Sequence, residues 1–359
     1  MLAGVAIADS WKAKFGEDAK IVFVGASGGI EERLVPRAGY PLELLKLGRL
    51  NRVKLAERIK TYFQLPLCFI QSARILIRLQ PVAVIGVGGF ASGPLVLIAR
   101  VLGFVGLIKA RTAILEQNSI PGMTNRILGK LVHEVFSAFP GTEAHFSGKN
   151  VRITGNPVRT AIEDVAKTRP DGPSMPFTVF IFGGSQGAIG INSLMIDSLP
   201  MLKSRIGELA IVHQTGERDF ERVRDGYTQA GVPARVEKFI YEMPEMYANA
   251  SLIVCRAGSS TLSEIAAVGR ASVLIPFPQA SDNHQEYNAR VFSDAGAAVL
   301  LLQQSSKGAD LAQVIIDLLD HPEKRRKMEV RVRDFHKAQA AYRITSELGA
   351  PLVEVPPKV

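Results

Sequence analysis

A glycine-rich segment directly after an apolar run is the strongest sign of chemistry in this sequence. The run Phe177–Phe182 leads into Gly183–Gly187, and a helical pattern over Ile191–Leu202 comes next. Free backbone N–H groups and the helix dipole favour an anion at such a helix N-terminus, and a diphosphate would fit. Ser185 could add a hydroxyl donor. The same residues would also form a tight strand-to-helix turn without any ligand.

A second strand-to-helix junction combines small residues with a carboxylate. The strand candidate Leu252–Cys255 leads into Arg256–Glu264, and Glu264 falls in the first turns of the predicted helix. There its carboxylate can accept two hydrogen bonds from a diol such as that of ribose, or it can simply favour the positive end of the helix dipole. Further on, the amides and the histidine of Asp282–Asn288 suit recognition of sugar hydroxyls, although His284 by itself is more typical of a structural role.

Two further polar segments lie in the first half of the chain. Gly86–Pro94 follows a strand candidate, and Leu115–Gly122 concentrates polar side chains between apolar segments. The first is not a dinucleotide-binding fingerprint, because its spacing differs and no acidic residue follows about 20 positions later. The sequence has no Asp-x-Asp, no pair of histidines at helical spacing and no P-loop. We therefore predict no metal and no cofactor, with the charge of a diphosphate met by helix N-termini and Arg159.

The elements that would position these segments alternate along the chain. Short β-branched runs are followed by amphipathic stretches, as parallel sheets of βαβ units require, and several runs end directly in glycine. Ligands of doubly wound sheets collect at such carboxyl ends of strands. We predict an α/β fold with two doubly wound domains, and these strands: Ala19–Val24, Val82–Gly86, Phe177–Phe182, Ile211–Thr215, Leu252–Cys255 and Ser272–Ile275.

The boundary between the two domains is predicted near Thr154–Arg159, where a strand-like Val151–Ile153 runs into glycine and proline. A length of 359 residues also favours two domains over one. A basic helix is expected over Lys324–Ala341. The predicted parts are an N-terminal domain over 1–157, a C-terminal domain over 158–340, and a final segment over 341–359 that packs back on the first domain.

The front of the first domain lacks an expected element. The chain opens with a helical stretch, Leu2–Lys14, before the strand Ala19–Val24, whereas a Rossmann-type half begins with a central strand and a glycine turn. Without that strand its neighbours would be unpaired along one edge. We expect either that the start codon has been placed too late or that the domain is incomplete.

Composition is typical of a globular intracellular protein. Apolar residues make up 47% and charged residues 21%, which leaves no room for a long disordered tail. Cys68 and Cys255 form neither a metal motif nor a disulfide framework, which indicates a reducing compartment. The apolar stretch Pro94–Ile108 contains Arg100 and is too short to cross a bilayer. Met1–Trp11 lacks the basic region of a signal peptide.

The net charge of +9 is unevenly distributed, since Met1–Pro157 holds 20 lysines and arginines against 10 acidic residues. Such an excess favours anionic lipid or nucleic acid as partner, or only keeps the surface soluble. We expect no nucleic acid, because stacking aromatics and a recognition motif are lacking. An apolar stretch, Leu65–Leu79, carries Arg74 and Arg78 and suits an anionic membrane surface, or a core helix with a solvated face. The basic residues before it are Lys46, Arg49, Arg52, Lys54, Arg58 and Lys60.

Taken in order, these motifs closely resemble one enzyme family. It is the UDP-N-acetylglucosamine–N-acetylmuramyl-(pentapeptide) pyrophosphoryl-undecaprenol N-acetylglucosamine transferases, which form lipid II in bacterial peptidoglycan synthesis. The resemblance covers nearly the whole chain, and seven motifs in the family's order are highly specific. They are Gly28–Pro36, Gly88–Pro94, Glu116–Asn118, Gly155–Arg159, Gly183–Gly187, Gly258–Glu264 and Asp282–Gln285.

The resemblance implies a GT-B fold, in which two Rossmann-like domains face a cleft and the second holds the donor UDP-N-acetylglucosamine. By position, the backbone of Ile240 would meet the uracil, Glu264 the ribose and Ser185 a phosphate. The donor site carried over from the family is Asn118, Arg159, Ser185, Ile240, Ser259, Ser260, Thr261, Leu262, Ser263, Glu264 and Gln285. The acceptor side would include Gly88, Gly89, Ser92 and Gly93.

The implied reaction is an inverting displacement. The C4 hydroxyl of the undecaprenyl-linked muramyl-pentapeptide attacks the anomeric carbon of the donor sugar while UDP leaves, and a general base takes the hydroxyl proton. The implied location is the cytoplasmic face of the cell membrane, as a peripheral protein.

The sequence departs from the family at two places. The family's opening strand, with its glycine-rich loop ending in histidine, is not present, and Leu115 stands where histidine is usual. Glu116 is then the candidate base. Three alternatives therefore stay open: a UDP-sugar-binding relative with impaired catalysis, a diacylglycerol glycosyltransferase of the same fold, and a UDP-N-acetylglucosamine 2-epimerase. The epimerase would need clustered acidic and histidine residues and no lipid acceptor.

Overall fold

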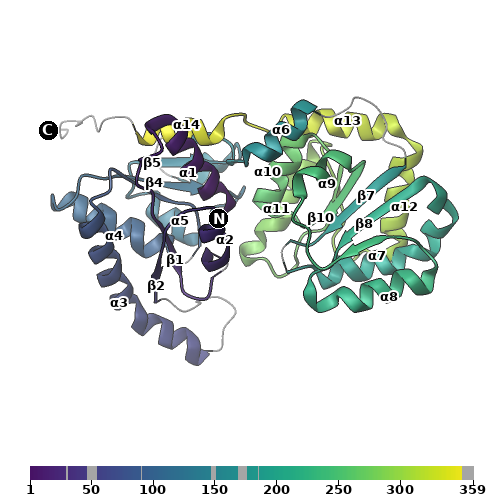
Figure 1. Ribbon diagram of the computed structural model, residues 1–359, viewed down its shortest axis with the longest axis horizontal. Helices are drawn as coiled ribbons and strands as arrows, with labels where there is room; N and C mark the ends of the chain where they lie inside the picture. The colour runs from purple at the N-terminus through teal and green to yellow at the C-terminus, as the bar shows by residue number, and fades with distance from the viewer. Residues whose placement is uncertain are drawn as a thin grey trace. The chain divides into compact units, whose positions relative to one another are not determined.

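The chain divides into two compact α/β units, one formed by Met1–Pro157 with Gln339–Val359 and the other by Val158–Ala338. Every strand pair in them is parallel (Figure 1), which confirms the predicted fold class. The computed structural model describes residues 1–29, 31–46, 55–89, 91–146, 151–168, 176–184 and 186–349. Over residues 55–64 it describes only the backbone.

The first unit contains two parallel sheets. Strand β1 (Phe23–Ala26) pairs with β2 (Leu42–Leu45), and a second sheet has the order β3-β4-β5-β6. Within the described ranges, no strand pairs with the other edge of β1 or of β3. The other elements are β3 Ala83–Gly86, β4 Arg111–Glu116, β5 Glu134–Ser137, β6 Val151–Ile153, α1 Leu2–Phe15, α2 Glu31–Arg37, α3 Leu55–Leu79, α4 Ser92–Phe104, α5 Met123–Leu128, α14 Ala340–Leu348 and a 3-10 helix, Thr142–His145.

Helix α1 lies against both of these sheets. A Cβ on Gly4 would come within 3.2 Å of the Phe23 ring in β1 and 3.3 Å of Val87, which follows β3. Helix α14 packs on α1, where the hydroxyls of Ser10 and Thr345 are 3.1 Å apart. Residues 341–349 therefore belong to the first unit, while 350–359 lie outside the described residues.

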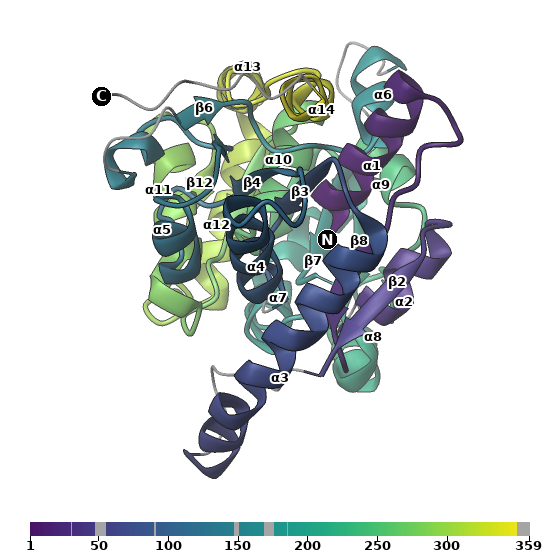
Figure 2. The same ribbon diagram turned by 90° about the vertical axis from the view of Figure 1, so that its left-hand side faces the viewer.

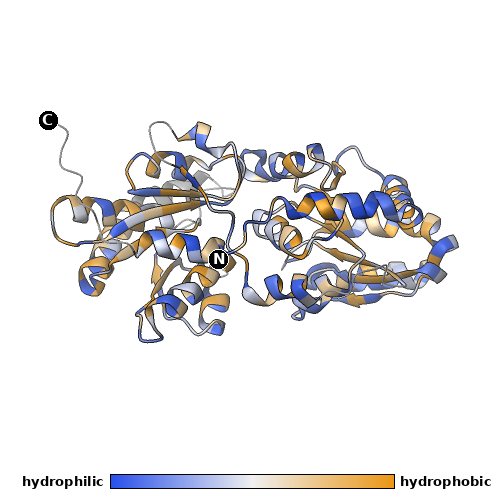
Figure 3. Cartoon of the chain, turned by 90° about the horizontal axis from the view of Figure 1, so that it is seen from above, coloured by the Kyte–Doolittle hydropathy of each residue, from blue (hydrophilic) through white to orange (hydrophobic). Residues whose placement is uncertain are grey.

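The second unit is built on one six-stranded sheet in the order β12-β11-β10-β7-β8-β9. Its strands are drawn mostly as hydrophobic in Figure 3, as expected for a parallel sheet that is buried on both faces. The elements are β7 Phe177–Phe182, β8 Leu209–Gln214, β9 Arg235–Glu237, β10 Leu252–Cys255, β11 Ser272–Leu274, β12 Val299–Leu300, α6 Thr160–Thr168, α7 Ile189–Leu202, α8 Phe220–Ala230, α9 Met243–Asn249, α10 Ser259–Val268, α11 His284–Asp294, α12 Gly308–Asp320, α13 Pro322–Arg333 and 3-10 helices at Lys203–Glu208, Glu217–Asp219 and Ser281–Asn283.

Alternate side chains of β7 fill the cores on its two faces. Val179 and Ile181 pack in the cluster that includes residues of α7, α8 and α12. On the other face, the rings of Phe180 and Phe182 make T-shaped contacts with the ring of Tyr247 from α9, whose centroid lies 6.3 Å from that of Phe180 and 6.2 Å from that of Phe182. The carboxyl end of β7, where the glycine-rich loop begins, is therefore rigidly held.

The prediction of a single basic helix over Lys324–Ala341 was wrong. Helix α13 ends at Arg333 and α14 begins at Ala340, after Gln339 adopts a left-handed φ of 60°. A residue in that conformation cannot continue a right-handed helix.

Candidate functional site

The loop after β7 approaches the end of β8 so closely that only glycine fits. Gly184 and Gly187 have φ values of 86° and 74°. A Cβ on Gly187 would overlap the carbonyl oxygen of Thr215, so this position is restricted by both space and conformation. The loop ends at Ile189, the first residue of α7, where helix N–H groups without intrahelical partners offer the predicted anion site. Ser185, the predicted phosphate ligand, lies outside the described residues.

The amide of Gln214, the last residue of β8, joins this loop to a second one. Its Nε2 donates to the carbonyl oxygen of Gly184 at 3.0 Å, and its Oε1 accepts the backbone N–H of Ile240 at 2.8 Å. Gln214 is only 3% exposed. Since the N–H of Ile240 is engaged, the contact with uracil predicted for Ile240 would fall to its carbonyl oxygen.

Two side chains from other elements hold the carboxylate of Glu264. Oε1 accepts a hydrogen bond of 3.0 Å from Nη2 of Arg159, and Oε2 accepts one of 2.9 Å from the hydroxyl of Tyr247. Burial raises the pKa of Tyr247 well above its usual value, and the nearby carboxylate adds to the rise. The phenol therefore stays protonated and donates. Two residues that the sequence singled out, Arg159 and Glu264, are thus in direct contact.

The residues before Glu264 form the start of α10. The side chain of Leu262 is fully buried, so this residue can contact a ligand only through its backbone. The hydroxyl of Ser263 donates to the carbonyl oxygen of Ser259 at 2.9 Å. The side chains that are partly exposed at this helix start are Ser259, Ser260, Thr261 and Ser263.

The loop after β11 is fixed by Gln285 and Arg256. Oε1 of Gln285 accepts the N–H of Phe277 at 3.0 Å, and the guanidinium of Arg256 lies 5.4 Å from the centre of the Phe277 ring. Arg256 also donates to the carbonyl oxygens of Ile275 and Pro276, both at 3.0 Å. Burial lowers the pKa of Arg256 to about 10, so it remains a cation at neutral pH.

In the first unit, the loops that follow β3 and β4 are tied together. Nε2 of Gln117 donates to the carbonyl oxygen of Val87 at 2.6 Å. The hydroxyl of Ser92 donates to the carbonyl oxygen of Gly88 at 2.7 Å. Gly88 and Gly89 have φ values of 94° and 85°. Of the predicted acceptor side, Gly88 and Gly89 therefore lie in the turn from β3 into α4, and Ser92 and Gly93 are the first residues of α4.

Glu116, the predicted base, organises the loop that follows it. Its Oε1 accepts the backbone N–H of Asn118 at 2.9 Å and the side-chain amide of Asn118 at 3.2 Å. Its Oε2 accepts the N–H of Gly122 at 3.2 Å and the amide of Asn125 at 2.8 Å. The side chain is 2% exposed. Glu116 therefore fixes the position of Asn118, which is one of the predicted ligands of the sugar donor.

Sequence reasoning missed Tyr247 and Gln214. Gln214 carried a usable signal, because it stands at the carboxyl end of a predicted strand, where ligand sites collect. Tyr247 carried none, since it lies in a seven-residue helix with no motif around it.

An apolar and basic surface lies on α3 and α4 of the first unit, which pack side by side with β2 next to α3 (Figure 2). In α3, Ile75 and Leu76 are buried whereas Leu67 and Ile70 are at least half exposed. The end of α4 adds Phe104, which is 84% exposed. We call this surface the α3–α4 patch; its apolar members are Leu67, Ile70, Ile77, Leu79, Val101, Phe104, Val105 and Leu107, with exposed Arg74, Arg78 and Lys109 among them.

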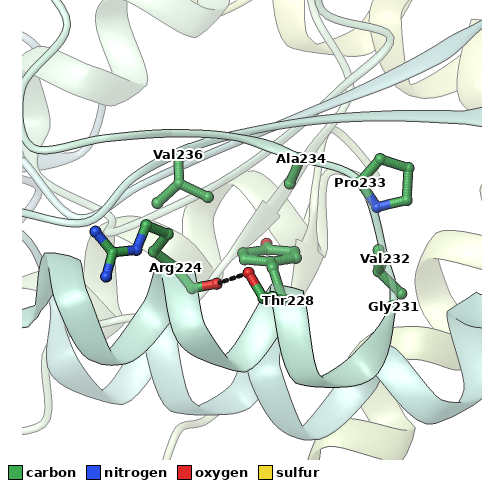
Figure 4. A pocket seen from close by; sticks show the side chains of 8 residues that line it. Arg224, Thr228, Gly231, Val232, Pro233, Ala234 and Val236 are labelled. Atoms are coloured by element: carbon green, nitrogen blue, oxygen red, sulfur yellow. Dashed lines mark hydrogen bonds between the residues drawn. The ribbon is translucent and has the colours of Figure 1, made fainter.

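The described part of the chain has neither a membrane-spanning helix nor a cluster of metal ligands. No helix there is long and apolar enough to cross a membrane, and no three His, Cys, Asp or Glu side chains there are grouped as metal ligands. A hollow of about 510 Å³ lies between α8 and β9 (Figure 4), but Arg224 at its rim is already paired with Glu221 and Asp225. It is lined by none of the predicted site residues.

Two family models match the chain: the glycosyltransferase family 28 N-terminal domain over residues 4–137 and the glycosyltransferase family 28 C-terminal domain over residues 178–344. A UDP-N-acetylglucosamine–N-acetylmuramyl-(pentapeptide) pyrophosphoryl-undecaprenol N-acetylglucosamine transferase of Myxococcus xanthus is 43% identical over 95% of this chain and 87% of its own length. A protein of the same name from Anaeromyxobacter sp. is 41% identical over 98% and 90%.

Solved structures agree with these matches. The crystal structure of Acinetobacter baumannii MurG is similar with a TM-score of 0.74 and 27% identity, over 97% of this chain and 95% of that one. A UDP-GlcNAc 2-epimerase from Neisseria meningitidis, bound to UDP-GlcNAc, has a TM-score of 0.66 at 12% identity, over 96% and 97%. The second likeness shows a shared fold alone.

Proposed function

Since the chain belongs to the family of UDP-N-acetylglucosamine–N-acetylmuramyl-(pentapeptide) pyrophosphoryl-undecaprenol N-acetylglucosamine transferases, we propose that it catalyses the reaction of that family. It transfers N-acetylglucosamine from UDP-N-acetylglucosamine to the C4 hydroxyl of the undecaprenyl-linked muramyl-pentapeptide, which converts lipid I into lipid II. This is a step of peptidoglycan synthesis.

The observation that carries the proposal is the buried carboxylate of Glu264, held by Arg159 and Tyr247 at the start of α10. In our proposal this carboxylate binds the ribose of the donor. The N-terminus of α7, with Ser185, receives the diphosphate, and the loop of Ile240 receives the uracil. The other donor ligands are those named from the sequence: Asn118, Ser259, Ser260, Thr261, Leu262, Ser263 and Gln285.

The first unit takes the acceptor side in this proposal, through the turn of Gly88, Gly89, Ser92 and Gly93. Glu116 stays a predicted base, and the four donors that contact its carboxylate hold that side chain in place. The chain works as a peripheral protein on the cytoplasmic face of the membrane, with the α3–α4 patch against anionic lipid. Each lysine or arginine near such a surface contributes about 1 kcal/mol.

A transfer assay tests the reaction. The full chain is incubated with labelled UDP-N-acetylglucosamine and a polyprenyl-linked muramyl-pentapeptide, and the lipid product is followed by chromatography. We expect one UDP released for each labelled lipid, and a loss of both in Glu264→Ala but not in Glu245→Ala, an exposed acidic residue of α9. UDP binding without any lipid product would support the non-catalytic relative, and formation of UDP-N-acetylmannosamine without acceptor would support the epimerase.

A further inference from the structure

The position of Tyr247 is fixed by burial, by two aromatic rings and by a hydrogen bond to its backbone. It is fully buried and makes T-shaped contacts with the rings of Phe180 and Phe182 in β7. Nε of the buried Arg270 donates to the backbone carbonyl oxygen of Tyr247 at 2.9 Å, which fixes the end of the short helix α9. The direction in which the phenol hydroxyl points is therefore set by packing.

That hydroxyl points at one oxygen of Glu264. The bond joins α9 to α10 over 2.9 Å, in a buried environment. The other bond to the carboxylate comes from Arg159, whose side chain is 34% exposed. Water can compete for the bond to Arg159, whereas it cannot reach the bond to Tyr247. Tyr247 is thus the more permanent of the two supports.

A carboxylate offers about four lone-pair positions. Arg159 and Tyr247 occupy one on each oxygen of Glu264, which leaves one on each oxygen. The two hydroxyls of a ribose are two adjacent donors, so the remaining positions match them in number. A carboxylate free to rotate would not hold both positions toward the diol at once.

We propose that Tyr247 is a positioning residue for nucleotide recognition: its hydroxyl fixes Oε2 of Glu264, so that the carboxylate meets both hydroxyls of a ribose at once. The proposal rests on the proposed function, in which Glu264 is the ribose ligand. It assigns to Tyr247 the preference of the site for a ribonucleotide over a nucleotide without the diol.

Calorimetry with UDP and with 2′,3′-dideoxy-UDP tests this role in Tyr247→Phe, which removes only the phenol oxygen. We expect UDP to bind roughly tenfold more weakly to the variant, because a lone pair of Glu264 loses its donor and the carboxylate its orientation. Binding of dideoxy-UDP should not change. Tyr227→Phe is the matched control, because Tyr227 is also buried and its hydroxyl lies 3.1 Å from Nδ1 of His213, outside this site.

A double variant separates positioning from packing. In Glu264→Ala, adding Tyr247→Phe should weaken UDP binding no further, because the group that Tyr247 orients is gone. Wild-type affinity for UDP in Tyr247→Phe, an equal loss for both nucleotides, or a variant that does not fold would each overturn the proposal. Failure of the wild-type chain to bind UDP at all would instead refute the proposed function on which it rests.

Discussion

Gln214 and Ile240, 26 residues apart in sequence, are joined by a buried hydrogen bond of 2.8 Å between Oε1 and the backbone N–H. Nε2 of the same side chain donates to the carbonyl oxygen of Gly184. One side chain thus connects the loop proposed to bind the diphosphate with the loop proposed to bind the uracil. Because both of its groups are used, the amide sets the spacing of these two loops.

Gln214→Met should therefore weaken UDP binding without removing any proposed ligand. The thioether has a similar length but neither donates nor accepts strongly. The buried N–H of Ile240 therefore loses its partner, and the carbonyl oxygen of Gly184 keeps only the N–H of Gly187. We expect an increase in the Kd for UDP of about tenfold or more, measured by calorimetry. Gln229→Met, on the exposed face of α8, is the control and should bind as the wild type does.

Gly187→Ala should disable the diphosphate site selectively. The new methyl group would meet the carbonyl oxygen of Thr215, and alanine disfavours a φ of 74°. UDP binding should fall at least about tenfold, while uridine, which lacks the diphosphate, should lose little. Gly207→Ala is the control, since a Cβ there meets no atom within 4 Å. Equal losses for UDP and uridine would show that the loop does not serve the phosphates.

The fold was predictable where strands are buried on both faces. Phe177–Phe182 and Leu252–Cys255 form with the predicted ends, because continuous apolar runs flanked by glycine or small residues identify central parallel strands. Strand β1 begins at Phe23 rather than at Ala19, since only Phe23–Ala26 finds a partner in β2. β5, Glu134–Ser137, was missed because its buried Glu134 pairs with Arg111 and Arg152, which a pattern of apolar residues cannot show.

The site was predictable only as motifs. Sequence named Arg159 and Glu264 separately, and the contact between them, 105 residues apart, came from the fold. Residues that support the ligands of a site, such as Tyr247 and Gln214, belong to no motif of their own, although Gln214 stands at the end of a predicted strand. Their role arises from burial and from which neighbour they face, and both depend on tertiary packing.

Replacing Glu116 tests whether it acts as a base or as the organiser of its loop. In Glu116→Gln, an amide N–H would replace an oxygen that now accepts hydrogen bonds from donors such as Gly122 and Asn125. Asn125→Ala removes one of these donors and leaves the carboxylate unchanged. We expect both to reduce transfer by similar factors, with the pH–rate profile unchanged. A base at Glu116 would give a different result: Glu116→Gln would lose far more activity than Asn125→Ala, and the acidic limb of the profile would disappear.

His213 should make the second unit less stable in mild acid. Burial lowers its pKa from 6.5 to about 3, so the unfolded chain binds a proton that the folded one does not between those values. Stability is then complete above about pH 6.5 and falls as the pH drops, by about 2 kcal/mol at pH 5. Hydrogen exchange of β7 and β8 peptides measures this.

In His213→Gln, protection is expected to be lower at both pH values, because the bonds to Tyr227 and Asn192 are weakened. The additional loss between pH 7 and pH 5 should disappear, however, because glutamine does not titrate. His321→Gln, at an exposed position of this unit, should keep the wild-type dependence. A wild-type dependence in His213→Gln would assign the effect to other groups.

Phe104 offers the sharpest test of the α3–α4 patch, because it is 84% exposed and the exposed Arg74 belongs to the same patch, whereas Arg78 is paired with Glu43. Burial of a phenylalanine side chain in lipid contributes about 1.5–3 kcal/mol. Phe104→Ser should therefore reduce sedimentation with phosphatidylglycerol vesicles by about tenfold or more, and leave UDP binding unchanged. Val330→Ser, which changes a side chain 62% exposed in the second unit, is the control. Wild-type sedimentation of Phe104→Ser would refute a membrane role for this surface, and equal binding to phosphatidylcholine vesicles would refute its preference for anionic lipid.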